Sequence, residues 1–113
     1  MNEKIIYHFV KPTFWQSQIE NNIYFSETFL TEKFIHASIR EQLQATANRY
    51  YKGYDSMILL HIDTTLLTSE LKYEMSESLQ QLFPHIYGGI NKNSIVISEI
   101  LTKNLDDSWE INK

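Results

Sequence analysis

The sequence of 113 residues lacks cysteine altogether and holds only three glycines and two prolines. Without cysteine, the chain cannot form a disulfide, a thiolate metal site or a cysteine nucleophile. Three glycines are too few for the glycine-rich loops that cradle phosphates in P-loop proteins and dinucleotides in Rossmann folds. These absences exclude the most recognisable nucleotide-binding motifs and direct attention to polar residues inside apolar segments.

Positive charge and long apolar runs are also scarce. The formal net charge is −4, and the only arginines are Arg40 and Arg49. Because phosphate binding over many contacts needs clustered positive charge, we expect no extended nucleic-acid surface, although one or two phosphates would fit a pocket. No apolar run approaches the roughly 18 residues of a membrane-spanning helix, and the apolar stretch after Lys4 is too short for a secretory signal. We therefore expect a cytoplasmic protein without membrane contact, and the sequence leaves its oligomeric state open.

The remaining composition suits one packed domain. Hydrophobic residues make up 42% of the chain and aromatic residues 13%, enough for a core in a chain of this length. We treat residues 1–113 as a single domain, with a core over about 4–101 and a C-terminal tail at 102–113. Short apolar runs outnumber helical patterns and do not alternate with them, which predicts an α+β fold with a mostly antiparallel or mixed sheet. The expected strands lie at 5–10, 34–37, 57–63, 71–75 and 95–101, and the two main helices at 13–19 and 38–51.

Three of the four histidines lie in apolar, aromatic-flanked segments, and these are His8, His36 and His85. A buried imidazole needs a hydrogen-bond partner or it destabilises the fold. The three residues therefore indicate either one shared polar cleft or three separately satisfied core positions. A metal site assembled from them is the least favoured alternative, and we expect no bound metal. His61 alternates with core residues beside Asp63 and is expected at the surface.

Two further residues have both a structural and a functional interpretation. Ser38 and Glu41 match a capping box, so Ser38 is expected to cap the second helix, although it could also line a cleft. A nucleophilic pairing of Ser38 with His36 is disfavoured, because side chains two apart on a strand are roughly 7 Å apart. Arg49, near the helix end, suits the helix dipole or, alternatively, a phosphate or carboxylate clamp.

Taken together, several segments resemble the domain-of-unknown-function family 952 over about residues 4–101. The segments are Ile6-Tyr7-His8, Phe34-Ile35-His36-Ala37-Ser38, Ala47-Asn48-Arg49-Tyr50-Tyr51, Leu59-Leu60-His61-Ile62-Asp63, Tyr73-Glu74 and Phe83-Pro84-His85-Ile86-Tyr87-Gly88.

The resemblance implies a fold similar to that of ADP-ribosylating toxins, poly-ADP-ribose polymerases and RNA 2′-phosphotransferases, in which a split antiparallel β-core grips NAD or a related intermediate. On that basis Tyr7-His8 would hold the nicotinamide ribose, and His36 or Ser38 would line the nicotinamide end. Those transferases use a glutamate in their third motif, whereas this chain has His85. An imidazole cannot supply the same negative charge to an oxocarbenium-like transition state, and Glu74 or Glu99 would have to replace it.

The favoured hypothesis is a small cleft protein that binds NAD, ADP-ribose or a related nucleotide. His8 would bond a ribose hydroxyl, Tyr7 or Tyr87 would stack on a ring, and Arg49 would take a phosphate. If the protein is an enzyme, we expect glycosyl or phosphoryl transfer, with His36 and His85 as acid or base. The alternative is a non-catalytic binding or interaction module on the same scaffold, which the missing glutamate favours.

Overall fold

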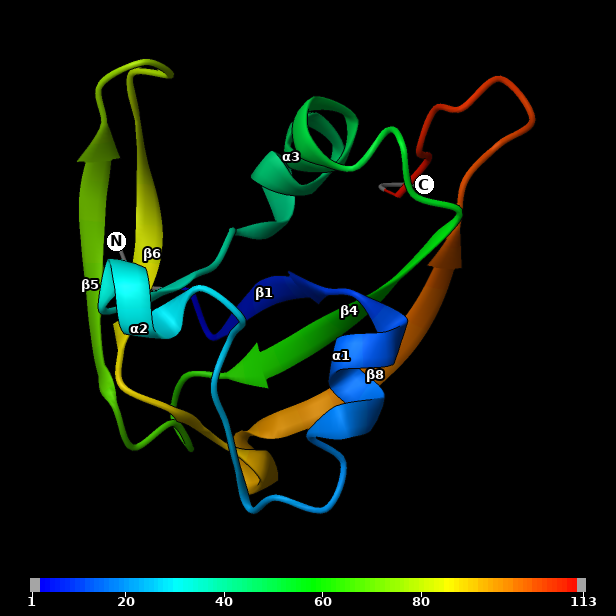
Figure 1. Ribbon diagram of the computed structural model, residues 1–113. Coiled ribbons are helices and arrows are strands. Elements are labelled where there is room, and N and C mark those ends of the chain that lie inside the picture. The colour runs from blue at the N-terminus through cyan, green and yellow to red at the C-terminus, as the bar shows by residue number, and fades with distance from the viewer. Residues whose placement is uncertain (1–2, 112–113) are drawn as a thin grey trace.

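A computed structural model describes residues 3–111 and places them in three β-sheets with short helices between them (Figure 1). Every strand pairing among these residues is antiparallel, which confirms the α+β class and the antiparallel character of the sheets. The first sheet has the order β1-β4-β8, with bounds Ile5–Val10, Ser56–Asp63 and Ile95–Thr102. The second has the order β3-β6-β5, with bounds Ile35–His36, Gln81–Tyr87 and Glu70–Ser76. The third pairs β2 (Ile23–Tyr24) with β7 (Ile90–Asn91).

The helices are shorter than the sequence patterns predict. Their bounds are α1 (Pro12–Ser17), α2 (Phe29–Glu32) and α3 (Leu43–Tyr50), with 3₁₀ turns η1 (Arg40–Gln42) and η2 (Lys92–Ser94). The expectation of two main helices therefore missed α2, a single turn within a segment that looks like a loop. The Thr28 hydroxyl donates to Glu32 at 2.7 Å across this turn, and Lys33 ends it in the left-handed conformation. A single turn of helix leaves too little periodicity to detect in the sequence.

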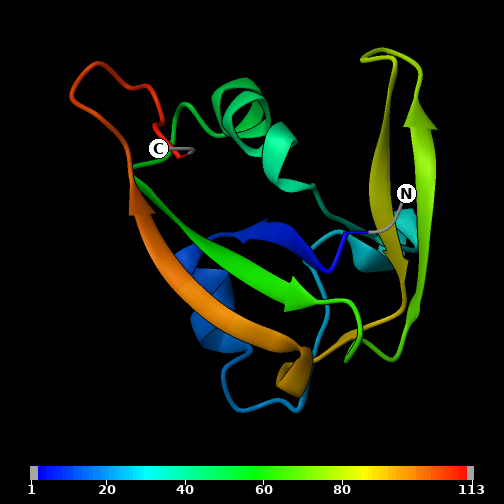
Figure 2. The ribbon, with the colours of Figure 1, turned by 180° about the vertical axis from the view of Figure 1, so that it is seen from behind.

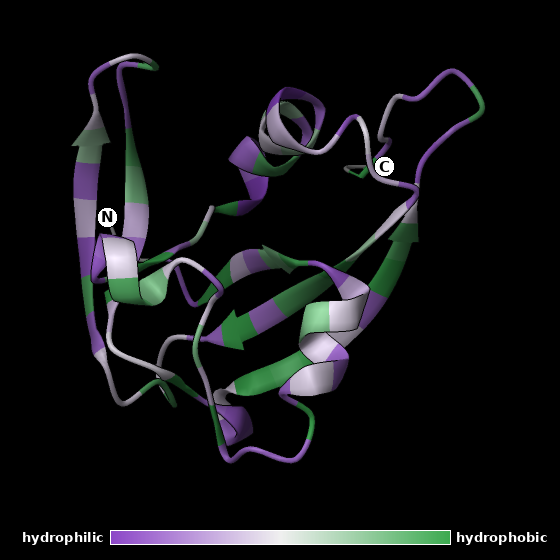
Figure 3. Cartoon of the chain, viewed as in Figure 1, coloured by the Kyte–Doolittle hydropathy of each residue, from purple (hydrophilic) through white to green (hydrophobic). Residues whose placement is uncertain are grey.

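β1 and β4 of the first sheet are buried on both faces, whereas β8 is mostly exposed. Ile6, Ile58 and Leu60 belong to one apolar cluster, whereas Phe9 and Leu59 belong to a second cluster beneath α3. Apolar residues run along β4 and also along β8, and α3 is mostly polar (Figure 3). The central strand is β4, which pairs with β1 on one side and β8 on the other. β1 is therefore an edge strand of this sheet, although its residues are mostly buried.

One backbone bridge connects the first two sheets. The Tyr7 amide donates to the Ser38 carbonyl, and the Ser38 amide donates to the Tyr7 carbonyl, both at 2.8 Å. Beyond this bridge the sheets diverge, as the view from behind also shows (Figure 2). The β-core is therefore split, with β1 on one side of the division and β3 with Ser38 on the other.

The turn into α3 is not capped by Ser38. Ile39 holds the N-cap position, and its amide donates to the side-chain oxygen of Gln42 at 3.0 Å. The expected box of Ser38 with Glu41 is therefore wrong by one residue. Burial explains the shift, because Gln42 also donates to the Leu82 carbonyl at 2.8 Å and so connects this turn to β6.

The C-terminal tail packs against α3 as far as the structure describes it. Trp109 is buried in the second cluster, and its indole N–H donates to the Tyr51 carbonyl at 2.9 Å. The Trp109 amide donates to the Asn48 side chain at 3.0 Å, and the Trp109 carbonyl accepts a hydrogen bond from Gln44.

None of the helices within residues 3–111 has the length and hydropathy needed to cross a bilayer.

Candidate functional site

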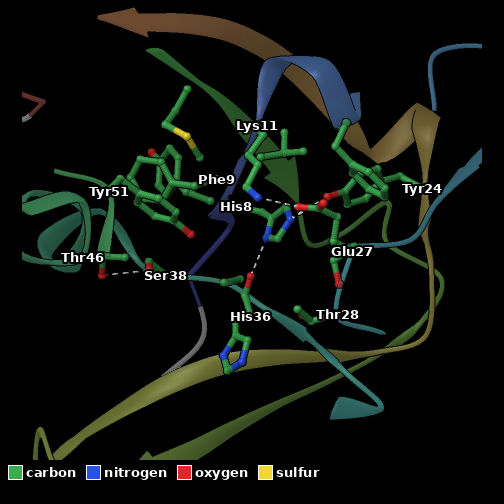
Figure 4. A pocket seen from close by; sticks show the side chains of 16 residues that line it. His8, Phe9, Lys11, Tyr24, Glu27, Thr28, His36, Ser38, Thr46 and Tyr51 are labelled. Atoms are coloured by element: carbon green, nitrogen blue, oxygen red, sulfur yellow. Dashed lines mark hydrogen bonds and ion pairs between the residues drawn. The ribbon is translucent and has the colours of Figure 1, made fainter. Parts of the chain in front are cut away.

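Two hollows lie side by side where the first and second sheets separate. The inner hollow has a volume of about 160 Å³ and the outer hollow about 690 Å³. They form one cleft, because six residues line both: Thr28, His36, Ala37, Ser38, Thr46 and Tyr51. The inner hollow is completed by Tyr7, His8, Phe9, Val10, Lys11, Phe14, Tyr24, Ser26, Glu27 and Met57 (Figure 4). The outer hollow is completed by Glu32, Tyr50, Ser76, Leu79, Phe83 and His85.

His8 is a buried, neutral wall residue of the inner hollow. Its Nδ1–H donates to the His36 carbonyl at 2.6 Å, and its Nε2 lies 2.9 Å from the Tyr24 hydroxyl, which then acts as donor. Burial lowers the pKa of His8 from 6.5 to about 4, and the hydrogen bond to the His36 carbonyl opposes this only in part. Burial also raises the pKa of Tyr24. Both groups are therefore uncharged near neutral pH, and both nitrogens of His8 already have partners.

His36 lies at the junction of the two hollows and is mostly exposed. Its Nε2 is 3.0 Å from a carboxylate oxygen of Glu32 on α2. Partial burial works to raise the pKa of Glu32, but hydrogen bonds from Thr28 and His36 outweigh it and hold that pKa below its usual value. Glu32 is therefore ionised at neutral pH and orients the His36 imidazole along the rim of the cleft.

His85 lines the outer hollow and belongs to a second histidine–carboxylate pair. Its Nδ1 lies 2.7 Å from Glu74 Oε1, and the Tyr87 hydroxyl donates to the same oxygen at 2.5 Å. These bonds, that from Tyr87 first, lower the pKa of Glu74 below its usual value. The Phe34 ring stacks on His85 with centroids 4.1 Å apart, and the His36 ring meets it edge-on at 5.3 Å. The result is a cluster of two imidazoles, each held by its own carboxylate.

The cleft brings together most of the residues singled out from the sequence. Tyr7, His8, His36 and Ser38 line the inner hollow, and His36, Ser38 and His85 line the outer one. The Ser38 hydroxyl lies 3.4 Å from that of Thr46, so it points along the cleft wall rather than capping the helix. Tyr87 lines neither hollow, and its hydroxyl is bonded to Glu74, which in turn is bonded to the cleft residue His85.

Arg49 is not part of the cleft. It is exposed on α3, lines neither hollow and lies against the Tyr50 ring, 5.9 Å from its centroid. Thr46 and Tyr50 are the residues of α3 that line the cleft. The structure therefore does not bring Arg49, the expected phosphate clamp, into this cleft.

Lys11, rather than Arg49, is the cationic residue that lines the cleft. It is the sole lysine or arginine among the described residues that line the two hollows, and its Nζ lies 3.5 Å from Glu27. Glu27 raises the pKa of Lys11. The sequence did contain a signal for Lys11, because Lys11 directly follows a strand and binding residues are often found in the loops next to strands. Glu27 follows β2, a strand of two residues, and has no comparable sequence signal.

Ser26 is a second cleft residue that the sequence did not reveal. It lines the inner hollow, and its hydroxyl oxygen is buried with no hydrogen-bond partner, the one such side-chain atom in the part of the chain that the structure describes. Unsatisfied buried hydroxyls are uncommon in folded proteins and often mark a place where another molecule completes the bonding.

The other acidic residues considered for the cleft lie elsewhere. Glu99 lies 2.6 Å from His61, across the first sheet, and lines neither hollow. His61 is therefore not a free surface residue as expected. Its side chain is 16% exposed, with Glu99 on one side and the Tyr7 ring edge-on at 4.9 Å.

Glu74 lines neither hollow, so the carboxylates that line the cleft are Glu27 and Glu32. Among residues 3–111 no group of three or more histidine, aspartate or glutamate side chains is arranged to hold a metal ion.

These features define a small α+β protein with a histidine-lined cleft between two antiparallel sheets. The chain belongs to the family described as protein of unknown function (DUF952), which matches residues 9–98. This confirms the family resemblance drawn from the sequence.

The chain is also similar to solved structures of the protein CC0527 from Caulobacter crescentus. One crystal structure is 26% identical, with a TM-score of 0.83, and the match covers 94% of this chain and 93% of that chain. A crystal structure of a double mutant gives 25% identity with the same TM-score and coverage. The solution NMR structure gives 26% identity, a TM-score of 0.81 and coverage of 96% and 93%. No curated protein matches the chain.

Proposed function

We propose that this protein binds NAD, ADP-ribose or a related nucleotide in the cleft, on a scaffold akin to the ADP-ribosylation fold. The observation that carries the proposal is the pairing of a small hollow walled by aromatic rings with a larger hollow that is lined in part by Glu32, His36 and His85. A nucleotide has the same division, because a flat ring is joined to a larger polar ribose-phosphate part. A cytoplasmic location, expected from the short apolar runs and consistent with the absence of cysteine, belongs to the same proposal.

The sizes of the hollows support this arrangement. A cavity of about 150 Å³ accepts one benzene ring, and the inner hollow has about 160 Å³. Its walls include the rings of Phe9, Tyr24 and Tyr51, which offer stacking faces to a heteroaromatic ring. The outer hollow, at about 690 Å³, lies within the range of roughly 300–1,000 Å³ typical of small-molecule sites.

The polar groups at the junction suit a ribose. The hydroxyls of Ser38 and Thr46 face the same part of the cleft and can exchange their mutual 3.4 Å contact for bonds to ligand hydroxyls. Ser26 offers a further unpaired hydroxyl to the ring in the inner hollow. His8 would contribute by fixing the Tyr24 hydroxyl, because direct contact with a ribose hydroxyl would cost it one of its two existing bonds.

The charge of the lining favours the nicotinamide end of NAD over extra phosphates. Lys11 faces Glu27 within the inner hollow, and Glu32 adds a second carboxylate in the outer one. Carboxylates and aromatic faces both attract a positively charged pyridinium ring. We therefore expect oxidised NAD to bind more tightly than its reduced form or than NADP.

A specific observation favours a non-catalytic binding module as the second candidate. Both carboxylates that line the cleft already have partners, Glu27 with Lys11 and Glu32 with His36. Neither carboxylate can replace the missing transferase glutamate without losing its present partner. Binding and catalysis must therefore be measured separately.

Calorimetry and thermal unfolding with NAD, reduced NAD, NADP, ADP-ribose and AMP test the proposal. Ligand at 100 times its dissociation constant stabilises a protein by about 2.7 kcal/mol, which is easily measured. Thr46→Phe places a ring at the junction of the two hollows and should abolish binding. Ala45→Phe is the matched control, because Ala45 is exposed on the same helix and lines neither hollow. If none of the five nucleotides stabilises the protein, or if both variants bind equally, the proposal fails.

A further inference from the structure

The β5–β6 hairpin carries a three-residue hydrogen-bonded unit, and one of its members, His85, lines the outer hollow. His85 and Tyr87 are two residues apart on β6 and share one face, and Glu74 lies across the ladder on β5. Glu74 Oε1 accepts from both, at 2.7 Å from His85 Nδ1 and 2.5 Å from the Tyr87 hydroxyl oxygen. The carboxylate is thus held from two directions and in turn holds the imidazole.

This unit determines which nitrogen of His85 faces a ligand. Because Nδ1 carries the hydrogen donated to Glu74, the lone pair of the neutral ring resides on Nε2. No hydrogen-bond partner for Nε2 is found within residues 3–111, and the residue lines the outer hollow. Phe34 stacks on the ring at 4.1 Å and an interplanar angle of 21°, which fixes its orientation. Other charged or titratable neighbours are Lys72 and Tyr87 on the hairpin, His36 on β3 and Glu32 on α2.

A purely structural role explains this arrangement less well. The Glu74 side chain is 38% exposed, and pairs of that exposure contribute little to stability. Two other pairs of the same chemistry are His61 with Glu99 at 2.6 Å, which lies outside both hollows, and His36 with Glu32 at 3.0 Å, in which His36 is mostly exposed. His85 differs from both, because it is largely buried and has its unpaired nitrogen in a hollow of ligand size. This is the geometry of a general base with an orienting carboxylate.

We propose that His85 is a general base that activates water in the outer hollow for hydrolysis of an N-glycosidic bond, with Glu74 and Tyr87 as positioning residues. The inference rests on the proposed function for the identity of the ligand. Glycosyl chemistry is favoured over phosphoryl chemistry because no lysine or arginine, among the described residues, lines the outer hollow to neutralise phosphoryl oxygens.

The step balances without a further reactant. Water gives one proton to Nε2 of His85 as its oxygen bonds to the anomeric carbon of the ribose. The carbon–nitrogen bond to the ring breaks, and its electron pair remains on the ring nitrogen. With NAD the pyridinium leaves as neutral nicotinamide, so no acid is needed at the leaving group. His85 then releases the proton to solvent, and the products are ADP-ribose and nicotinamide.

The test measures NAD binding by calorimetry and nicotinamide release by chromatography on the same full-length samples. Loss of a general base lowers kcat by roughly 10²–10⁴-fold, so His85→Gln should show that loss while binding NAD as the wild type does. Glu74→Gln and Tyr87→Phe should lower kcat more than they raise KM. Long-range nitrogen NMR of the free protein should show the His85 hydrogen on Nδ1 in the wild type and a mixture of tautomers in Glu74→Gln, and the fall in kcat without a matching rise in KM separates positioning from a merely structural contact.

His61→Gln and Glu99→Gln form the matched control, because they remove the equivalent pair outside the cleft. Both should keep the wild-type rate. If the wild type binds NAD but releases no nicotinamide, the role of His85 as a general base is rejected, whereas the proposed nucleotide binding is still supported. Absence of NAD binding would overturn both. Equal losses of rate in the His85 and His61 variants would show that the effect comes from the fold, and the role of His85 would be rejected.

Discussion

The side chain of His8 is hydrogen-bonded to the main chain of His36, with 2.6 Å between Nδ1 and the carbonyl oxygen. This bond joins β1 to β3 across the division between the two sheets, next to the Tyr7–Ser38 bridge. It places a neutral imidazole in the wall of the inner hollow, where its second nitrogen fixes the Tyr24 hydroxyl. The stability of the fold and the shape of the cleft therefore depend on the same ring.

The depressed pKa of His8 makes stability depend on pH. Below pH 6.5 the unfolded chain binds a proton at His8 that the folded chain does not take up until about pH 4. Stability should therefore fall as the pH drops through this window, by roughly 3 kcal/mol from this group alone. Urea unfolding at a series of pH values would measure it. His8→Gln, which does not titrate, should show a correspondingly smaller loss between pH 6.5 and 4, and equal slopes for the two proteins would refute the assignment.

Gly88 is required for close packing at the end of β6. Its φ is +150°, and an added Cβ would lie 2.4 Å from the Ser69 hydroxyl oxygen. That hydroxyl donates to the Gly89 carbonyl at 2.6 Å, so it cannot move without losing a bond. We expect Gly88→Ala to lower the free energy of unfolding by about 1–3 kcal/mol. Gly53→Ala, where nothing lies within 4 Å, should change it by less than about 0.5 kcal/mol.

Trp109 holds the tail against the helix that forms one wall of the cleft. Trp109→Ala should cost about 3–5 kcal/mol, because it leaves a cavity in the second cluster and an unpaired carbonyl at Tyr51. Chemical unfolding followed by circular dichroism gives the value. Leu105→Ala, in an exposed part of the same tail, is the control and should be close to neutral. A small effect at Trp109 would mean that the tail does not support α3.

Gln42 and Glu41 offer a direct comparison of the two versions of the helix cap. Gln42→Ala removes the partner of the Ile39 amide and of the Leu82 carbonyl, and we expect a loss of about 1–3 kcal/mol. Glu41→Ala should cost less than about 0.5 kcal/mol, since the side chain is exposed and no bond to it is present within residues 3–111. If Glu41→Ala instead lowers the free energy of unfolding more than Gln42→Ala does, the capping box of Ser38 with Glu41 is favoured.

Strand positions were predictable from the sequence because burial repeats along a strand. The pattern placed β1, β4 and β8 within one residue of their observed bounds, and it marked His8, His36 and His85 as neighbours of the core. That these three lie around one cleft was a hypothesis. In the structure the rings of His36 and His85 are in contact, whereas the His8 ring meets neither of these rings and is bonded to the main chain of His36.

The misses concern features without a repeating pattern. Arg49 and Thr46 differ only in their rotation about α3, which depends on packing against the tail and the first sheet. Glu27 reaches the cleft because two residues of β2 pair with two of β7, a contact too short to leave a periodic signal. The capping box involves Ile39 and Gln42 rather than Ser38 and Glu41, because Gln42 also bonds β6, which is distant in the sequence.

The Tyr7–Ser38 bridge has a mechanical consequence. The first two sheets are joined at this edge by one reciprocal pair of hydrogen bonds rather than by a continuous ladder. Such a junction acts as a hinge, because the sheets can rotate slightly about it without breaking any pairing inside either sheet. We expect the gap between them to adjust to the thickness of an inserted ring, with amide hydrogen exchange at Tyr7 and Ser38 slowing as the ring locks the hinge.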